Sequence, residues 1–498
     1  MNYVDLHLLR IAVACSVTWW LGAGTLARAQ DLTRDEPTQL STVYYDYASE
    51  DGTLSGGRIE LPVTVPGTGP FALRGDVTTL LNSGPPANRI DIVLVGDGYT
   101  LADLGVYAQQ VNSWLAGFLA AEPFHSYSHH FNVHRVDVIS TDSGVDNDPI
   151  YPTYPTWRDT ALDMGFFCGG MQRLLCVDVA KAYAYAQSAP DVDTVLAVAN
   201  SSSYGGAGYV SESLATFAGG NIWASEIALH ESGHSLAGLA DEYNEADGSR
   251  YAGSEPSEPN LSILTAAQMA AAGTKWSRWL GVDNASYDGL QSTYEGAYYC
   301  QYGIYRPSNN SKMRLLGRPY NLPTAEALVI AIYKLVHPID AATPNSSPLS
   351  ERDTITVTLV QPVGHSLSVQ WYLDGQALSG ETDTSLELST LGLARGVHAA
   401  SVAVLDPTDL VRDEAARQQW LREGRQWTVS VGQRLGDMNC DGGVDFDDIS
   451  PFVKGLLGQA VYEAKYPGCN WLNGDYTNDG VVDFGDINAF VAALARPQ

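Results

Sequence analysis

The chain has little positive charge. Its 498 residues include 28 lysines and arginines against 57 aspartates and glutamates, so the formal net charge is −29 and the sequence pI is about 4.5. A surface of this sign repels nucleic acids and anionic membranes, and it keeps an exported protein soluble. The composition therefore argues against a nucleic-acid partner, and it fits a protein that coordinates calcium.

Long hydrophobic runs are missing after the first 30 residues. In that segment Arg10 precedes an apolar run over residues 11–26, and Ala27-Arg28-Ala29 places small residues where signal peptidase cleaves. The run is shorter than the roughly 20 apolar residues that a membrane span needs. We therefore expect residues 1–29 to be a cleaved signal peptide, with an uncleaved anchor as the alternative. The mature protein is then secreted (extracellular, periplasmic or associated with the cell surface) and has no transmembrane segment.

Cysteine is scarce, with six in the chain. Cys168 and Cys176 are close in sequence, and Cys440 and Cys469 both lie in the C-terminal segment. In an exported chain this spacing predicts two local disulfide bonds. Cys300 is then either a buried free thiol or one end of a different pairing.

The chain is too long for one hydrophobic core, because domains usually hold roughly 100–200 residues. Short alternating runs between Gly- and Pro-rich turns predict a small N-terminal β unit over residues 30–85. Buried strands alternating with helices predict an α/β domain over residues 86–342. Strand-like alternation over residues 349–431, with Trp371 facing inward, fits an immunoglobulin-like β-sandwich, and another all-β module is the alternative.

The α/β pattern also predicts individual elements. Strands are expected at residues 90–95, 131–140 and 194–199, and helices at residues 101–121, 177–186, 222–237 and 324–336.

The expected helix over residues 222–237 carries His230, Glu231 and His234. Positions i and i+4 share a helix face, so the two imidazoles can reach one ion. Zinc held by these groups and one more ligand leaves a position open for water and lowers the pKa of that water to about 7. Glu231 is then placed to act as the general base, without being a ligand. The alternative is a solvent-facing pair of histidine and glutamate on an ordinary helix.

A third ligand follows the helix. Gly238 stands where the helix should end, because glycine permits the left-handed turn that stops a helix. A reversal at Gly238 would bring Asp241 back towards the ion, so we expect Asp241 to be the ligand, with Glu242 as the alternative.

The stretch from His230 to Tyr243 resembles the signature of the IgA-peptidase family of zinc metallopeptidases, which belong with the metzincin-like zincins. Residues 92–99, 131–146 and 294–308 resemble other segments of that family. The resemblance implies a zincin fold and zinc-dependent endopeptidase activity. The metzincin helix reads H-E-x-x-H-x-x-G-x-x-H or D, whereas the glycine and the aspartate come one position later here. This shift leaves the third ligand open.

Further roles are implied around this helix. Residues 311–314 have the S-x-M form of the metzincin methionine turn, so Met313 would pack below the metal ligands. A Ser- and Gly-rich segment could pair with an extended substrate through its backbone, and its residues are Tyr204, Gly205 and Gly206. Arg306 or Tyr320 could stabilise the oxyanion.

Residues 432–498 contain two copies of one acidic pattern. Oxygen side chains at loop positions 1, 3, 5, 9 and 12, with glycine at position 6, are typical of an EF-hand-like calcium loop. The two expected sites consist of Asp437, Asn439, Asp441, Gly443, Asp445 and Asp448, and of Asp475, Thr477, Asp479, Val481, Asp483 and Asp486. An apolar helix follows each loop, and the segment resembles type I dockerin domains. The resemblance implies two calcium ions and a cohesin-like or cell-surface partner.

These patterns together predict a multidomain, secreted zinc endopeptidase that hydrolyses extracellular proteins or glycoproteins. The alternatives are an inactive zincin-like adhesion or scaffold protein and a zinc hydrolase of non-peptide amides. The sequence does not select a protein substrate. It also leaves open whether residues 30–85 are removed on activation, since no cysteine there could block a zinc ion.

Overall fold

The computed structural model describes residues 38–49, 51–64, 74–151, 154–245, 247–394, 396–431 and 434–495. The expected signal peptide, residues 1–29, lies outside the described residues. Within the described part of the chain, no helix is long and apolar enough to cross a membrane.

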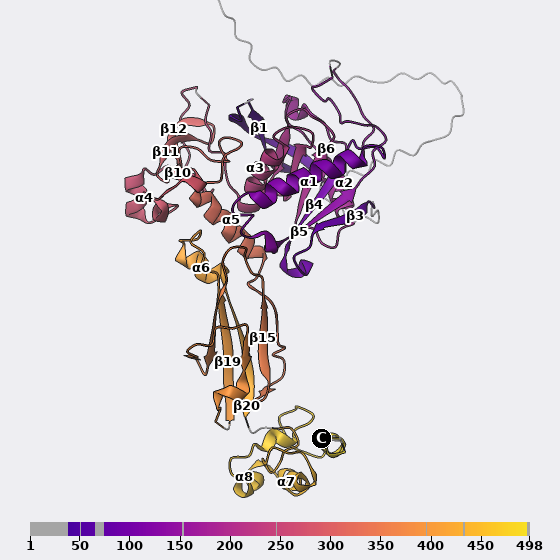
Figure 1. Ribbon diagram of the computed structural model, residues 1–498, viewed down its shortest axis with the longest axis vertical. Helices are drawn as coiled ribbons and strands as arrows, with labels where there is room; N and C mark the ends of the chain where they lie inside the picture. Colours follow the sequence, from indigo (N-terminus) through magenta and orange to yellow (C-terminus); the bar gives the residue numbers. More distant parts are fainter. Residues whose placement is uncertain are drawn as a thin grey trace, which may run out of the picture. The chain divides into compact units, whose positions relative to one another are not determined.

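An eight-stranded mixed sheet forms the frame of the α/β domain, in the order β2-β1-β7-β8-β6-β4-β5-β3 (Figure 1). Its parallel strands are β4 (Ile90–Asp97), β5 (Phe131–Asp137), β6 (Thr194–Ala199) and β8 (Leu214–Ala218). Every residue of β4 is buried, and its apolar side chains alternate between the cores on the two faces of the sheet. The three strands expected from buried apolar runs are therefore present at the centre of this sheet.

The remaining strands run against their neighbours. They are β7 (Gly206–Tyr209) beside β8, the hairpin of β1 (Thr38–Ala48) and β2 (Leu54–Thr64) beside β7, and β3 (Asp76–Leu81) beside β5. The expected separate N-terminal β unit over residues 30–85 is therefore wrong, because its described strands belong to the main sheet. The physical reason is that a hairpin cannot bury its own apolar residues. Val43 and Val63 pack into one core of the domain and Leu54 into the other.

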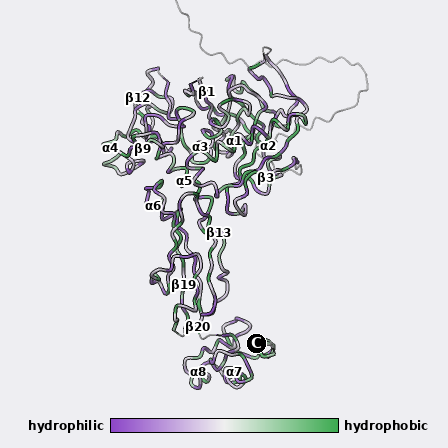
Figure 2. The backbone as a smooth tube through the Cα atoms, viewed as in Figure 1, coloured by the Kyte–Doolittle hydropathy of each residue, from purple (hydrophilic) through white to green (hydrophobic). Residues whose placement is uncertain are grey.

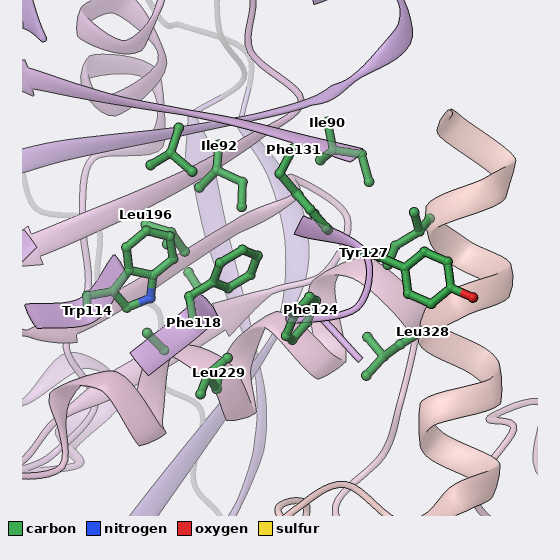
Figure 3. Close-up of a cluster of buried hydrophobic side chains, with 14 of the residues drawn as sticks. Ile90, Ile92, Trp114, Phe118, Phe124, Tyr127, Phe131, Leu196, Leu229 and Leu328 are labelled. Atoms are coloured by element: carbon green, nitrogen blue, oxygen red, sulfur yellow. The ribbon is translucent and has the colours of Figure 1, made fainter. Parts of the chain in front are cut away.

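Helices cover both faces of the sheet. Helices α1 (Leu104–Ala120), α3 (Ala224–Ala237) and α5 (Leu322–Leu335) pack on one face, and α2 (Val179–Ala186) packs on the other. Helix α1 buries Trp114 and Phe118 against Leu196 of the sheet and Leu229 of α3 (Figure 3). This shared core fixes where α3 lies over the strands. The segment between α3 and α5 contains α4 (Ala266–Ala272), β9 (Asp283–Asn284), β10 (Gly289–Leu290), β11 (Tyr294–Ala297) and β12 (Cys300–Arg306).

Two further sheets share a core in the next part of the chain. One contains β13 (Ile339–Ala342), β15 (Thr354–Leu359) and β18 (Ser385–Glu387), and the other contains β14 (Leu349–Ser350), β16 (Ser368–Leu373), β17 (Gln376–Ala377), β19 (Gly396–Leu405) and β20 (Arg422–Val431). Helix α6 (Glu414–Trp420) precedes β20. Hydrophobic and hydrophilic residues follow one another along these strands (Figure 2), and Trp371 is buried beside Trp427. Because β13 pairs with β15, the β region begins at Ile339, whereas we expected the α/β domain to extend to residue 342.

The C-terminal segment contains α7 (Ile449–Gly455), α8 (Gln459–Lys465) and α9 (Ile487–Leu494). Both expected disulfide bonds are present, Cys168–Cys176 and Cys440–Cys469. Cys300 has no disulfide partner and is only partly buried.

The core that positions α3 can be tested on α1. Phe118 is 1% exposed, whereas Val106 on the same helix is 45% exposed. We expect Phe118→Ala to lower the free energy of unfolding by about 3–5 kcal/mol, because it opens a cavity in the core. Val106→Ala should change it by less than about 0.5 kcal/mol. Chemical denaturation followed by tryptophan fluorescence measures both, and equal effects would contradict this packing.

Candidate metal centre

Helix α3 and the turn that ends it assemble the site. His230, Glu231 and His234 are all buried on this helix. The helix ends at Gly238, which has a φ of 61° and donates its N–H to the carbonyls of Gly233 and His234. This left-handed turn reverses the chain and returns Asp241 to the histidines.

Four ligand groups converge at this place: Asp46, His230, His234 and Asp241. The two Nε2 atoms lie 3.1 Å apart. Asp46 Oδ2 is 2.8 Å from His230 Nε2, and Asp241 Oδ1 is 3.1 Å and 3.4 Å from the Nε2 atoms of His230 and His234. Ligand atoms about 2.0–2.1 Å from a tetrahedral zinc ion lie about 3.3 Å from one another. These separations of 2.8–3.4 Å are close to those of a tetrahedral metal site.

Backbone carbonyls fix the orientation of both imidazoles. His230 Nδ1 donates to the carbonyl of Lys312 at 3.0 Å, and His234 Nδ1 donates to the carbonyl of Leu239 at 2.7 Å. Because a carbonyl can only accept, each Nδ1 carries a hydrogen, and the Nε2 of each imidazole is the nitrogen left to bind a metal ion. Second bonds of this kind are what orient metal-binding histidines. The two Nε2 atoms, 3.1 Å apart, are therefore oriented to bind one metal ion.

The charges of the four groups also indicate that a cation binds here. Burial by itself lowers the pKa of His230, but the Asp46 and Asp241 carboxylates outweigh burial and raise that pKa well above its usual value. Burial likewise opposes ionisation of Asp241, yet the neighbouring histidines hold its pKa below the usual range. Asp241 Oδ1 has no hydrogen-bond partner. Two buried carboxylates therefore require a positive charge at this point, and a divalent cation supplies it.

Glu231 lies beside this group without being part of it. It is fully buried, and neither carboxylate oxygen has a hydrogen-bond partner. Burial raises the pKa of Glu231 well above its usual value, and the Asp46 charge adds to the effect. A Cβ atom at position 208 would lie 2.5 Å from Glu231 Oε2. Glycine at position 208 is thus what lets this carboxylate lie against β7.

The two candidates for the third ligand, Asp241 and Glu242, have different surroundings. Asp241 joins the histidines, whereas Glu242 accepts hydrogen bonds from Asn260, Ser311 and Asn321 at 2.7–3.1 Å. Burial raises the pKa of Glu242 to about 7. Its backbone N–H donates to the carbonyl of Met313 at 2.7 Å. Glu242 therefore ties the turn after α3 to the segment that carries Met313.

Met313 is fully buried directly against α3. A Cβ atom at Gly233 would lie 2.9 Å from Met313 Sδ. Met313 therefore packs against the helix that carries the histidines, and its place in a methionine turn stays a prediction.

The suggested oxyanion donors do not fit. The Arg306 guanidinium donates to the carbonyls of Glu295, Gly296 and Asn309, and the Tyr320 hydroxyl donates to the carbonyl of Leu229. The polar groups of both side chains therefore already donate to backbone carbonyls. The expectation that Arg306 or Tyr320 stabilises an oxyanion is therefore not supported.

Sequence reasoning missed the residues that come from distant segments. Asp46 belongs to β1, and besides its contact with His230 it accepts a hydrogen bond from the Tyr243 hydroxyl. The Tyr299 hydroxyl donates to Asp241, and Tyr44 stacks on His234 with 4.5 Å between ring centroids. An acidic residue among tyrosines in a strand-like run was the only signal for Asp46, and nothing local connects it to α3.

The glycine-rich segment lies next to the metal group. Gly206 starts β7, and Gly205 accepts a hydrogen bond from Ala218 of β8. Burial and the charges of Asp46 and Glu231 raise the pKa of Tyr204 well above its usual value. The substrate-binding role of Tyr204, Gly205 and Gly206 stays a prediction.

The two acidic C-terminal loops share one conformation. Asp437 accepts from the backbone N–H groups of residues 441 and 442, and Asp475 accepts from those of residues 479 and 480. Asp448 and Asp486 each accept three backbone N–H groups at equivalent positions. Gly442 and Gly480 have φ values of 92° and 85°. Position 6 of each loop thus has the sharp turn that a calcium loop needs. Among the described residues, however, the buried group in the α/β domain is the one set whose ligand atoms already converge.

Removal of one histidine tests the centre. We expect His234→Ala to weaken the binding of a divalent transition metal by at least ~100-fold, since loss of an outer partner alone costs about 10- to 100-fold. His125→Ala, which changes an exposed histidine, should bind the metal as the unaltered protein does. Titration followed by elemental analysis measures both affinities. Equal metal binding by the two variants would exclude this centre.

Comparison with known proteins agrees with the geometry. No curated protein matches the chain. Residues 78–286 match the sequence model of the family described as IgA Peptidase M64. The matched region includes the central strands, α3 and Asp241, whereas Asp46 and Met313 lie outside it. Residues 78–286 of this chain are therefore a peptidase domain of the IgA Peptidase M64 family.

Proposed function

We propose that this protein is a secreted, zinc-dependent endopeptidase that hydrolyses extracellular polypeptides. Membership of the domain in a metallopeptidase family supports peptide-bond hydrolysis. The observation that carries the proposal is the buried group of two imidazoles and two carboxylates, with the unpartnered Glu231 beside it. Two disulfide bonds support export, because such bonds persist in oxidising compartments.

Zinc fits this ligand set best. Imidazole and carboxylate ligands in a tetrahedral arrangement of this size are those of zinc sites. When bound, zinc supplies a Lewis acid that polarises the scissile carbonyl and acidifies the attacking water. His230, His234 and Asp241 would hold the ion, and the carbonyls of Lys312 and Leu239 keep the imidazoles in place.

Glu231 performs the proton transfers in this proposal. Its carboxylate accepts the proton of the attacking water and then donates it to the departing amine. Burial raises the pKa of this group well above its usual value, which favours uptake of a proton from the attacking water. A fully buried carboxylate with no partner costs stability. A scaffold protein without catalysis has no use for such a group, and this favours an enzyme over the adhesion alternative.

The substrate would bind as an extended strand. Strand β7 starts beside Glu231. Its side away from β8, which β1 holds in this structure, would pair with peptide backbones of many sequences once it is free. Tyr204, Gly205 and Gly206 would line this strand. A polypeptide fits such an edge better than a non-peptide amide does.

Glu231→Gln tests the reaction. We expect this variant to hydrolyse fluorescent casein about 10²- to 10⁴-fold more slowly, because it loses the general base. Its zinc content, measured by elemental analysis, should remain at one ion in the peptidase domain. Ser232→Ala on the same helix should keep both properties. Unchanged hydrolysis by the Glu231 variant, or hydrolysis that persists after removal of zinc by a chelator, would refute the proposal.

We further propose that the C-terminal segment binds two calcium ions and docks onto a cohesin-like or cell-surface partner. The repeated loop conformation supports calcium, since backbone N–H groups already hold the aspartates at positions 1 and 12 of each loop. Aspartates whose carboxylates crowd one loop repel each other without a cation. Burial and the charges of Asp448 and Asp441 raise the pKa of Asp437.

Calcium should therefore stabilise this segment. A ligand that binds only the folded state raises the free energy of unfolding by about 2.7 kcal/mol when its free concentration is 100 times the Kd. We expect calcium to raise the unfolding temperature of the C-terminal segment and Asp437→Ala to reduce that increase. Asp447→Ala, which alters an exposed aspartate outside the ligand positions, should respond to calcium as the unaltered chain does. Calorimetry with calcium and with a chelator makes the comparison, and an absent calcium effect would count against the site.

A further inference from the structure

The metal centre is closed in this structure. Asp46 is 3% exposed, His230 is 1% exposed, and His234, Asp241 and Glu231 are fully buried. An endopeptidase has to bring the backbone of another chain to its metal and its general base. Whatever covers this centre must therefore leave before a polypeptide can bind.

The cover comes from the hairpin of β1 and β2, residues 38–64. Asp46 of β1 provides the fourth converging ligand group, 2.8 Å from His230 Nε2. A catalytic zinc site holds three protein ligands and keeps the fourth position open for water or substrate. With Asp46 in place, the chain itself fills that position.

The same hairpin also takes the sheet edge that a substrate would use. β1 runs antiparallel to β7 and pairs Val43 with Tyr209 and Tyr44 with Gly208. Gly208 is the residue against which the Glu231 carboxylate lies. Tyr44 stacks on the ring of His234 from this strand, so β1 and α3 lie side by side (Figure 1). An incoming strand cannot pair with this edge of β7 while β1 occupies it.

The contacts of the hairpin suit a part that moves as one body. β1 pairs with β2 along its whole length, but with β7 at only two positions. Outside the sheet the hairpin is held by Leu54, Val43 and Val63 in the cores of the domain and by polar contacts. Among the polar contacts are those of Arg58 with Tyr298 and of Ser41 with Glu212. The backbone of Gly52 accepts from Leu316. The eleven paired positions of β1 and β2 do not depend on β7, so the two strands can leave β7 together.

We propose that residues 38–64 are an inhibitory segment of the peptidase. Asp46 fills the position of the attacking water, and β1 fills the place of the substrate strand. Displacement of the hairpin from β7 opens both positions at once, for an extended polypeptide that adds to β7 as an antiparallel strand. This inference rests on the proposed peptidase function.

The Asp46→Ala variant of the full chain tests the inference. The probe is acetohydroxamate, a small chelating ligand that needs a free position on the zinc ion, and its binding is measured by calorimetry. Because a closed state lowers apparent affinity in proportion to its population, we expect the variant to bind the probe at least ~10-fold more tightly than the unaltered chain. The zinc content should stay at one ion, and casein hydrolysis should rise by a similar factor. Glu60→Gln, an exposed change on the same hairpin, is the matched control and should show no increase.

The outcomes separate the inhibitory role from a structural one. If Asp46 is a permanent ligand, Asp46→Ala loses zinc and gains no probe binding, and the proposal is overturned. Equal probe binding by the unaltered chain and the variant overturns it as well. Arg58→Ala leaves Asp46 in place and removes the contact with Tyr298, so it should also increase probe binding, by a smaller factor. This second variant decides the matter if Asp46→Ala does not fold.

The measurements also distinguish this inference from the peptidase function itself. Tighter probe binding with retained zinc, but without hydrolysis of casein by any variant, supports the inhibitory hairpin and refutes the peptidase. Full hydrolysis by the unaltered chain with no gain in Asp46→Ala supports the peptidase and refutes the hairpin.

Discussion

The structure depends on two imidazole nitrogens that face each other 3.1 Å apart between two buried carboxylates. While the Nδ1 atoms donate to carbonyls, the two Nε2 atoms and the two carboxylates are left to share a positive charge, which a metal ion between them would supply. Features that look unrelated serve this requirement. Gly238 turns the chain so that Asp241 and the carbonyl of Leu239 both reach the histidines, and Gly208 leaves room for Glu231. The carbonyl of Lys312 arrives from a segment that Glu242 ties to the same turn.

The burial that makes this centre chemically effective also conflicts with its use. The low dielectric constant of a buried site strengthens the binding of an ion by carboxylates and imidazoles. Burial also raises the pKa of Glu231. A polypeptide substrate, however, needs an open edge and a free ligand position. The hairpin of β1 and β2 reconciles the two demands in our proposal, because it completes both the sheet and the ligand set while the enzyme is idle.

The rest of the chain is built from parts with their own cores. The β region after α5 packs Trp371 and Trp427 between two sheets, and the C-terminal segment packs its helices around a small cluster that includes the Cys440–Cys469 disulfide bond. Such small cores commonly need a disulfide or a metal to be stable. The aspartates of the two loops are therefore best understood as part of how this segment folds, in addition to any role in docking.

The sequence by itself determined the features that depend on neighbours along the chain. Short-range geometry accounts for the helical spacing of His230, Glu231 and His234, the turn at Gly238, the two local disulfide bonds and the repeated loops. It left open which of Asp241 and Glu242 faces the histidines. Tertiary structure decided what depends on strand pairing between distant segments. In the folded chain β1 and β2 belong to the main sheet, and Asp46 lies in the metal group. The Arg306 guanidinium and the Tyr320 hydroxyl donate to backbone carbonyls. Which strand pairs with which edge is set by the packing of the whole domain, so no local pattern around Asp46 could have placed it beside His230.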